Sequence, residues 1–248
     1  NVAIGSGALL VATTAADNTA VGTLALTANS SGTDNTAVGY AAGDAVTTGD
    51  ANTFVGDNAG GATTTADNNT AVGASALLLN TTGTQNVAVG ALALDAVTTA
   101  SYLTAVGYGA LGANTSGTGN TGVGYAAGGA LTTGGNNTAV GQNALLYVTT
   151  ASRNTAIGTA SLDASSNAGD DNTAVGYNAL TANTTGTDNT SVGSSSMGTN
   201  TTGASNTAVG FNTLFANTTA SNNTGLGYNA LAGNTTGINN TAVGSLAL

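Results

Sequence analysis

The sequence predicts an all-β fold, a parallel β-solenoid (β-roll) of about fifteen 17-residue coils. Three observations predict it: a short motif ending in glycine returns at a nearly constant interval, this motif alternates like a β-strand, and the remaining residues are typical of turns. An α-helical repeat is excluded, because helix-pair repeats need about 33 residues or more. Thr, Val, Gly and Asn are also poor helix formers.

The repeat is marked by the glycine that closes each N-T-A-V-G motif. Every interval between these glycines is 17 residues, except the interval from Gly158 to Gly176, which is 18. We therefore predict a single repeat array over residues 1–248, with a one-residue insertion near residues 165–171. Because the sequence begins inside the pattern, we expect it to be a segment of a longer protein. The fifteen glycines are Gly5, Gly22, Gly39, Gly56, Gly73, Gly90, Gly107, Gly124, Gly141, Gly158, Gly176, Gly193, Gly210, Gly227 and Gly244.

The working consensus is N-T-A-V-G-Y-N-A-L-x-A-N-T-T-G-x-D, with positions numbered 1 to 17. Thr at position 2 and Val at position 4 share one face of an extended segment, and Ala at position 3 faces the other way. Gly at position 5 and Gly or Ala at position 15 mark turns, so we expect two short β segments and two turns in each coil. Equivalent residues of stacked coils lie about 4.8 Å apart, so each position forms a column along the axis.

Stacking explains most repeated residues without a binding site. Asn occupies position 1 in fourteen of the fifteen copies and predicts an amide ladder, and Thr at positions 13 and 14 predicts hydroxyl hydrogen bonds between coils. The glycine column at position 5 predicts a positive φ or an approach too close for a Cβ.

Only positions 4 and 9 carry bulky apolar side chains in most coils, which makes the interior lean. Neighbouring positions 8 and 9 point to opposite faces if that segment is extended. One apolar column is therefore expected to lie outside the coil, where another chain covers it. The sequence predicts an oligomer.

The composition excludes most chemistry. The chain lacks Cys and His, which removes the usual zinc sites, thiol nucleophiles and His-based triads. Arg153 is the only base and the net charge is −10, so nucleic acid is excluded as a partner. No apolar run approaches the roughly 20 residues of a membrane span. We expect no enzyme activity, no cofactor and no membrane insertion of this segment.

The motifs resemble known repeats. Asn1-Val2-Ala3-Ile4-Gly5 and the many N-T-A-V-G copies resemble the repeats of trimeric autotransporter adhesin heads, and residues 172–186 are similar to repeats of phage tail-fibre and related surface-fibre proteins. The resemblance covers the whole chain. It implies a left-handed roll, three identical chains side by side and the rigid part of an extracellular fibre. No catalytic residue is carried over.

Aromatic residues recur at position 6, and they are the candidate contacts for a glycan. Such a column could stack on the sugar rings of a glycan, or its rings could shield the coil edge or fill a groove between chains. Both interpretations remain open from the sequence. The six residues are Tyr40, Tyr108, Tyr125, Tyr177, Phe211 and Tyr228.

Most aspartates fall in two bands of the repeat. Carboxylates at turns could coordinate Ca²⁺, but Asp is also an ordinary turn residue, so we expect no specific metal site. A glycosidase needs two carboxylates at a defined separation, and Asp170 with Asp171 is the only local pair. Position 10 holds Asp44, Asp95 and Asp163, and positions 16 or 17 hold Asp17, Asp34, Asp50, Asp67, Asp171 and Asp188.

The function expected from these observations is structural. We expect a self-assembling rod, the shaft or head of an extracellular fibre at a cell or virion surface, with identical chains as partners in a homotrimer. The alternative is a ligand-binding surface on the coils. That surface would be a glycan- or receptor-binding adhesin face, or an ice-binding face built from the threonine columns at positions 13 and 14.

Overall fold

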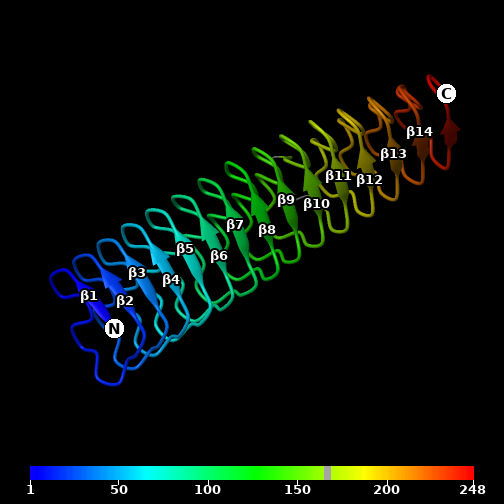
Figure 1. Cartoon of the computed structure of the whole chain (residues 1–248). Coiled ribbons are helices and arrows are strands. Elements are labelled where there is room, and N and C mark those ends of the chain that lie inside the picture. Colours follow the sequence, from blue (N-terminus) through cyan, green and yellow to red (C-terminus); the bar gives the residue numbers. More distant parts are fainter. Residues whose placement is uncertain (165–168) are drawn as a thin grey trace. The chain divides into compact units, whose positions relative to one another are not determined.

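The computed structural model describes residues 1–164 and 169–248, and it confirms an all-β parallel solenoid (Figure 1). Each coil contributes one strand of three residues at positions 2–4, and the described residues include no helix. The chain divides into two compact units, Asn1–Asn120 and Thr121–Leu248. The first unit holds β1 (Val2–Ile4), β2 (Thr19–Val21), β3 (Thr36–Val38), β4 (Thr53–Val55), β5 (Thr70–Val72), β6 (Val87–Val89) and β7 (Thr104–Val106). The second holds β8 (Thr121–Val123), β9 (Thr138–Val140), β10 (Thr155–Ile157), β11 (Thr173–Val175), β12 (Thr190–Val192), β13 (Thr207–Val209), β14 (Thr224–Leu226) and β15 (Thr241–Val243).

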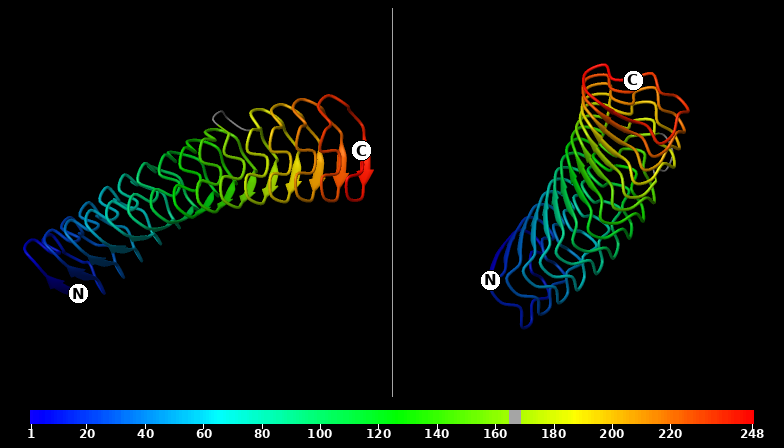
Figure 2. Two further views of the ribbon diagram at one scale, coloured as in Figure 1. Left: turned by 90° about the horizontal axis from the view of Figure 1, so that it is seen from above. Right: turned by 90° about the vertical axis from the view of Figure 1, so that its right-hand side faces the viewer.

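Within each unit, neighbouring strands are parallel and stack in the order of the chain (Figure 2). Each strand residue pairs with its equivalent in the next coil, as Ala20 pairs with Ala37. The hydrogen bonds continue past the strand, because the N–H of Gly22 at position 5 donates to the carbonyl of Ile4 at 2.7 Å. The columns predicted from the 17-residue period are therefore confirmed within both units.

The predicted insertion near residues 165–171 changes the register between two coils. Asp163 accepts a hydrogen bond from Thr181, which lies 18 residues later, whereas Gly169 lies against Gly186, which lies 17 residues later. The spacing between equivalent residues thus changes from 18 to 17 between Asp163 and Gly169. Residues 165–168 of the predicted insertion lie outside the described residues.

The prediction of two β segments in each coil is wrong, because only positions 2–4 form a strand. Positions 6–11 form consecutive turns, in which the N–H of Thr27 donates to the carbonyl of Leu24 and the N–H of Asn29 to that of Leu26. Non-glycine residues at positions 7, 9 and 17 adopt the left-handed conformation, with φ of 61° at Leu24 and 49° at Leu26. These turns replace the second strand.

The left-handed residues also correct the expectation for positions 8 and 9. Ala25 and Leu26 are both fully buried, because the turn at Leu26 rotates its side chain to the same side as that of Ala25. The left-handed conformation costs about 1–2 kcal/mol, and burying a leucine contributes about 1.5–3 kcal/mol. Burial of the leucine thus offsets the backbone strain. The core consists of positions 1, 3, 8, 9, 12 and 15 in most coils.

One large side chain compensates for two missing leucines. Phe54 occupies position 3, where most coils have Ala, and it is fully buried. Gly43 and Gly60 occupy position 9, where most coils have Leu. A Cβ on Gly43 would lie 2.6 Å from Cδ2 of Phe54, and a Cβ on Gly60 would lie 2.5 Å from Cδ1. The ring therefore fills the space of two absent side chains.

The predicted amide ladder at position 1 is confirmed. The N–H of Asn52 donates to Oδ1 of Asn35 at 2.9 Å, and the N–H of Asn69 donates in turn to Oδ1 of Asn52 at 3.0 Å. The Nδ2 of Asn52 also donates to the carbonyl of Ala66, at position 15 of the same coil, at 2.8 Å. These side chains are buried, so each one joins two ends of its own coil and binds the next coil.

The threonines at positions 13 and 14 behave differently from each other. At position 13, the hydroxyl of Thr64 donates to the carbonyl of Thr81 at 3.1 Å, and the hydroxyl of Thr81 donates to the carbonyl of Thr98 at 2.9 Å. The position-14 residues Thr65 and Thr82 are exposed. Hydroxyl bonds between coils are therefore confirmed at position 13, with backbone carbonyls as the acceptors.

Asparagines at position 12 form a second amide column in part of the chain. The Nδ2 of Asn200 donates to Oδ1 of Asn183 at 3.1 Å, and the Nδ2 of Asn217 donates to Oδ1 of Asn200 at 2.9 Å. Asn114 occupies the same position one coil after Val97. Its Oδ1 and Nδ2 are both buried and have no hydrogen-bond partner in the described part of the chain. Asn114 therefore contributes an unpaired amide to the core.

The substitution Asn114→Val is expected to raise the free energy of unfolding by about 1–3 kcal/mol, because it removes the desolvation penalty of two unpaired polar atoms. Valine already occupies this column at Val97, where it is fully buried. Chemical denaturation followed by circular dichroism measures the change. Asn80→Val is the control, since its Nδ2 donates to the carbonyl of Gly83 and its Oδ1 accepts from the N–H of Gly83. A loss of stability in N114V would contradict the prediction.

Candidate functional site on the outer faces of the coils

The strands turn one regular face outward. Position 3 is buried, so positions 2 and 4 point away from the coil, and their side chains are half-buried or exposed. We call this surface, made of the residues at positions 2 and 4, the Thr/Val face. The exposed fraction is 38% at Val38 and 46% at Leu226. Its apolar column is Ile4, Val21, Val38, Val55, Val72, Val89 and Val106 in the first unit, and Val123, Val140, Ile157, Val175, Val192, Val209, Leu226 and Val243 in the second.

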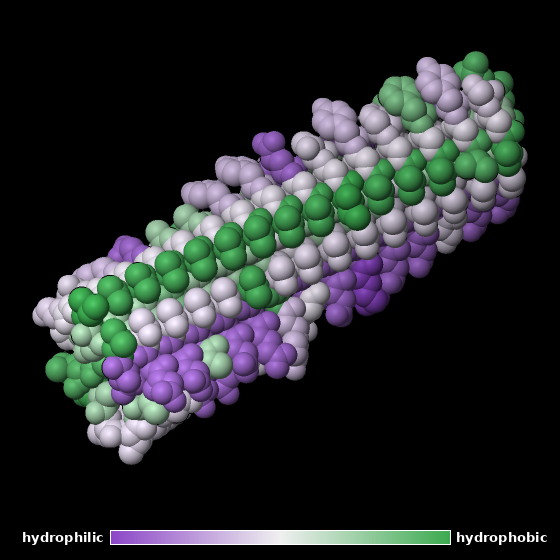
Figure 3. Space-filling model, viewed as in Figure 1, coloured by the Kyte–Doolittle hydropathy of each residue, from purple (hydrophilic) through white to green (hydrophobic). Residues whose placement is uncertain are grey.

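The valine column of the Thr/Val face forms an apolar stripe on each unit, and less apolar residues lie beside it (Figure 3). No charged residue occupies position 2 or 4 in any coil. The apolar column that the sequence places outside the coil is therefore position 4. Sequence reasoning paired positions 2 and 4 on one face, but it did not show that this face is the outer one. In the described part of the chain, the hydroxyls at position 2 have no hydrogen-bond partner within the chain.

The six aromatic residues predicted at position 6 all lie on the outside, with exposed fractions from 45% at Phe211 to 57% at Tyr177. Hydrogen bonds keep this column in register, because the N–H of Asn229 at position 7 donates to the carbonyl of Phe211 at 2.9 Å. Phe211 and Tyr228 are stacked, with ring centroids 5.5 Å apart and planes 11° apart. The structure thus brings these two rings together.

Aspartate carboxylates accept hydrogen bonds from turn residues of the preceding coil. The carboxylate of Asp50 accepts hydrogen bonds from the N–H of Thr33 at 2.6 Å and from its hydroxyl at 3.1 Å, and Asp67 accepts from the N–H of Asp50 at 2.8 Å. Burial raises the pKa of Asp44 and of Asp95 at position 10. Within residues 1–164 and 169–248, no three acidic side chains come together as a metal site requires.

Arg153, the single basic residue, forms ion pairs with the two neighbouring aspartates Asp170 and Asp171. Nε of Arg153 lies 2.6 Å from Oδ1 of Asp171, and its Nη2 lies 3.1 Å from Oδ2 of Asp170. The hydrogen bonds from Arg153 lower the pKa of Asp171. All three side chains are exposed, so this ion pair contributes little to stability. The pair has the geometry of a surface salt bridge.

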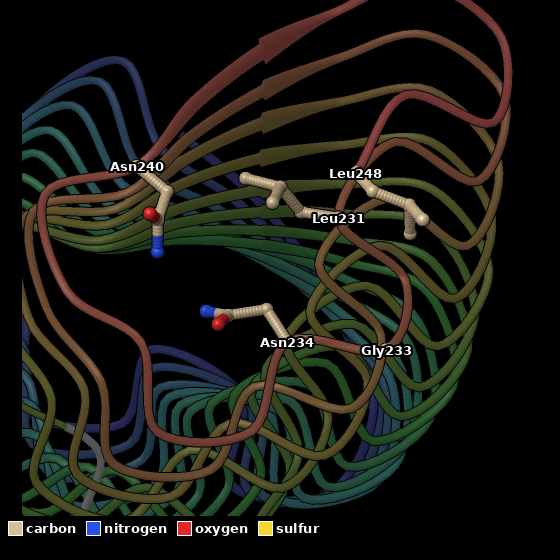
Figure 4. Close-up of a pocket in the computed structure, with 5 residues that line it drawn as sticks. All are labelled: Leu231, Gly233, Asn234, Asn240 and Leu248. Atoms are coloured by element: carbon tan, nitrogen blue, oxygen red, sulfur yellow. The ribbon is translucent and has the colours of Figure 1, made fainter.

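The cavity of about 340 Å³ in the second unit lies inside the coil of residues 223–239 (Figure 4). Leu231, Asn234 and Asn240 line it, and they occupy column positions 9, 12 and 1. Leu214, at the same column position as Leu231, is fully buried under the next coil. The cavity therefore lies in line with the core columns of the coils before it.

The fold and its outer columns define a β-solenoid repeat protein. Comparison with known proteins gives no match: no family model, no curated protein and no solved structure matches the chain. No helix long and apolar enough to cross a membrane occurs in the described residues.

Proposed function

We propose that this chain is a structural segment of an extracellular fibre at a cell or virion surface, in which three identical chains pack through their Thr/Val faces. The observation that carries the proposal is the outer column at position 4. Its side chains are half-buried or exposed in the single chain, and yet all fifteen are Val, Ile or Leu. The threefold number, the fibre and the surface location rest on the resemblance of the motifs.

The fifteen coils provide an internal comparison between columns. Position 17 also faces solvent, and it varies among Asp, Asn, Gln, Ala, Ser, Gly, Tyr102 and Arg153. Position 4 occurs fifteen times, and none of these residues is polar. A column that faces only water has no physical reason to exclude polar residues. A column that is covered by another chain does, because an unpaired polar group at an interface is costly.

Charge points to the same surface. A net charge of −10 makes identical chains repel each other. The Thr/Val face has no charged residue, so two chains can approach through it without bringing carboxylates together. Burying the exposed apolar area of this face stabilises the assembly by about 25 cal/mol per Å². Because the apolar residue recurs in every coil, every coil contributes. Contact with host glycans or receptors, if the fibre is adhesive, would use other surfaces.

The proposal is tested by placing charges on the face. Val175→Asp with Val192→Asp is expected to convert a trimer to monomers, raising the midpoint concentration of assembly by about tenfold or more, because two carboxylates per chain would be desolvated in the interface. Analytical ultracentrifugation measures this shift, and circular dichroism checks that the coils remain folded. The matched control is Ser205→Asp with Asn222→Asp at position 17, where Asp188 is already present. A wild-type chain that stays monomeric at high concentration would refute the assembly.

Ice binding is a second candidate for the same face. The position-2 threonines repeat in register with the strand ladder, their hydroxyls have no partner among the described residues, and valine methyl groups run beside them. Such an array presents regular hydroxyl and methyl groups to water. The two uses exclude each other, because assembly would cover the hydroxyls. A monomeric wild-type chain with thermal hysteresis would favour ice binding, and an assembled chain without hysteresis would favour the fibre.

A further inference from the structure

We infer that the second unit binds one uncharged sugar ring at position 6. The sugar would lie over the side chain of Ser194, between the ring of Tyr177 in the preceding coil and the ring of Phe211 in the following coil, and we call this place the slot. This binding site goes beyond the structural role proposed above. It also narrows the aromatic column at position 6 from six candidate residues to one place.

The slot arises because one ring is missing from a column of rings. Four successive coils carry Tyr177, Ser194, Phe211 and Tyr228 at position 6. The N–H of Ser195 donates to the carbonyl of Tyr177 at 2.9 Å, and the N–H of Asn212 donates to that of Ser194 at 3.1 Å. These bonds hold successive position-6 residues one coil apart. Tyr177 and Phe211 are two coils apart, or about 9.6 Å along the axis.

The stacked pair beside the slot fixes how a ring would fit. Phe211 stacks on Tyr228 with planes only 11° apart, so the other face of Phe211 points toward the level of Ser194. A ring at that level would lie about 4.8 Å from the residues on either side, within the roughly 4.5–7 Å centroid range of stacked rings. The ligand ring would thus occupy the place that a tyrosine at position 194 would fill.

The surroundings select an uncharged ring with polar edges. Every position-6 residue of the second unit is uncharged, and the only base, Arg153, is already paired with Asp170 and Asp171. An anionic sugar would find no cation here, and a nucleotide or nucleic acid would bring phosphates toward a chain of charge −10. A neutral pyranose has apolar C–H faces for stacking on the rings and hydroxyls at its edge. The half-buried Ser194 hydroxyl has no partner in the described part of the chain, so it is available to those hydroxyls.

The test is the substitution Ser194→Tyr. It weakens sugar binding if the sugar ring occupies the slot, and it strengthens binding if any exposed aromatic ring of the column binds sugars. Ser194→Tyr fills the slot with the chain's own ring, and tyrosine at position 6 is already accepted in five other coils. We expect the wild-type chain to bind at least one uncharged hexasaccharide, with cellohexaose, maltohexaose and chitohexaose as the probes, in calorimetric titrations at millimolar concentration. Binding to S194Y is expected to be about tenfold weaker or absent. A strip that binds sugars with any exposed ring would instead bind more tightly in S194Y.

Two further variants complete the test. Tyr177→Ser removes one wall of the slot and is expected to weaken binding about tenfold, whereas Tyr40→Ser is the matched control, because Tyr40 lies between Thr23 and Asp57 with no ring two coils away. Ultracentrifugation of each variant shows whether assembly is unchanged, which separates this result from the fibre proposal. Undiminished binding in S194Y, equal losses in Y177S and Y40S, or no binding of the wild-type chain to any probe would overturn the slot.

Discussion

Replacing Phe54 by alanine is expected to lower the free energy of unfolding by about 3–5 kcal/mol, because it opens a cavity where one ring fills the space of two leucines. The ring is fully buried and lies against Gly43 and Gly60, neither of which has a side chain that could close the gap. Denaturation followed by circular dichroism measures the loss. Hydrogen exchange should locate it in the coils of residues 35–51 and 52–68, since each coil of a solenoid contacts mainly its neighbours.

The same site allows a rescue. In the F54A background, Gly43→Leu with Gly60→Leu restores the consensus of Ala at position 3 and Leu at position 9, and it is expected to recover most of the lost stability. In the wild-type background the same leucines are expected to destabilise the chain, because their Cβ atoms would overlap the Phe54 ring. This reversal of sign is a coupling that a double-mutant cycle measures. Additive effects would contradict the compensation.

The second large effect is expected at the glycine column. Gly73 has φ of 137°, and a Cβ there would lie 2.6 Å from the carbonyl carbon of Gly90 and 2.9 Å from the backbone nitrogen of Ala91. Gly73→Ala is therefore expected to cost about 3 kcal/mol or more, because the strain can be relieved only by separating two coils. Thermal unfolding and hydrogen exchange of the amides around Gly90 measure this separation.

Gly109→Ala is the matched control. Gly109 has φ of 60°, and a Cβ there would meet no atom within 4 Å. Ala41 adopts φ of 48° at the same position of another coil. The cost of G109A should not exceed the roughly 1–2 kcal/mol of a left-handed residue. Equal losses in G73A and G109A would contradict the prediction, because they would show that the close contact with Gly90 adds no cost at position 5.

Much of the fold could be predicted because the period is strict. A constant spacing of 17 residues requires that equivalent residues meet one coil later, so the Asn18–Asn35 ladder and the close glycine column follow from repetition alone. The direction of the strand side chains also followed, since alternation places positions 2 and 4 on one face and position 3 on the other. The aromatic column was predicted in the same way, from spacing.

The turns could not be predicted. Leucine rarely adopts a left-handed conformation, and nothing in the consensus indicates that Leu26 has φ of 49°. Because of that angle, the side chains at positions 8 and 9 both point into the interior. Of the two apolar columns, position 9 is therefore the buried one and position 4 is the outer one. The stacking of Phe211 on Tyr228 likewise depends on ring orientation, which spacing does not determine.

The sequence by itself determined the repeat, the parallel register and the absence of the residue types that most catalytic and metal sites need, because each of these depends only on which residues recur and how often. Only the tertiary structure decided which apolar column is buried and which faces outward, since that choice depends on the backbone angles at positions 7, 9 and 17. It also decided that Phe54 serves two coils, because the space left by Gly43 and Gly60 exists only once those coils are stacked.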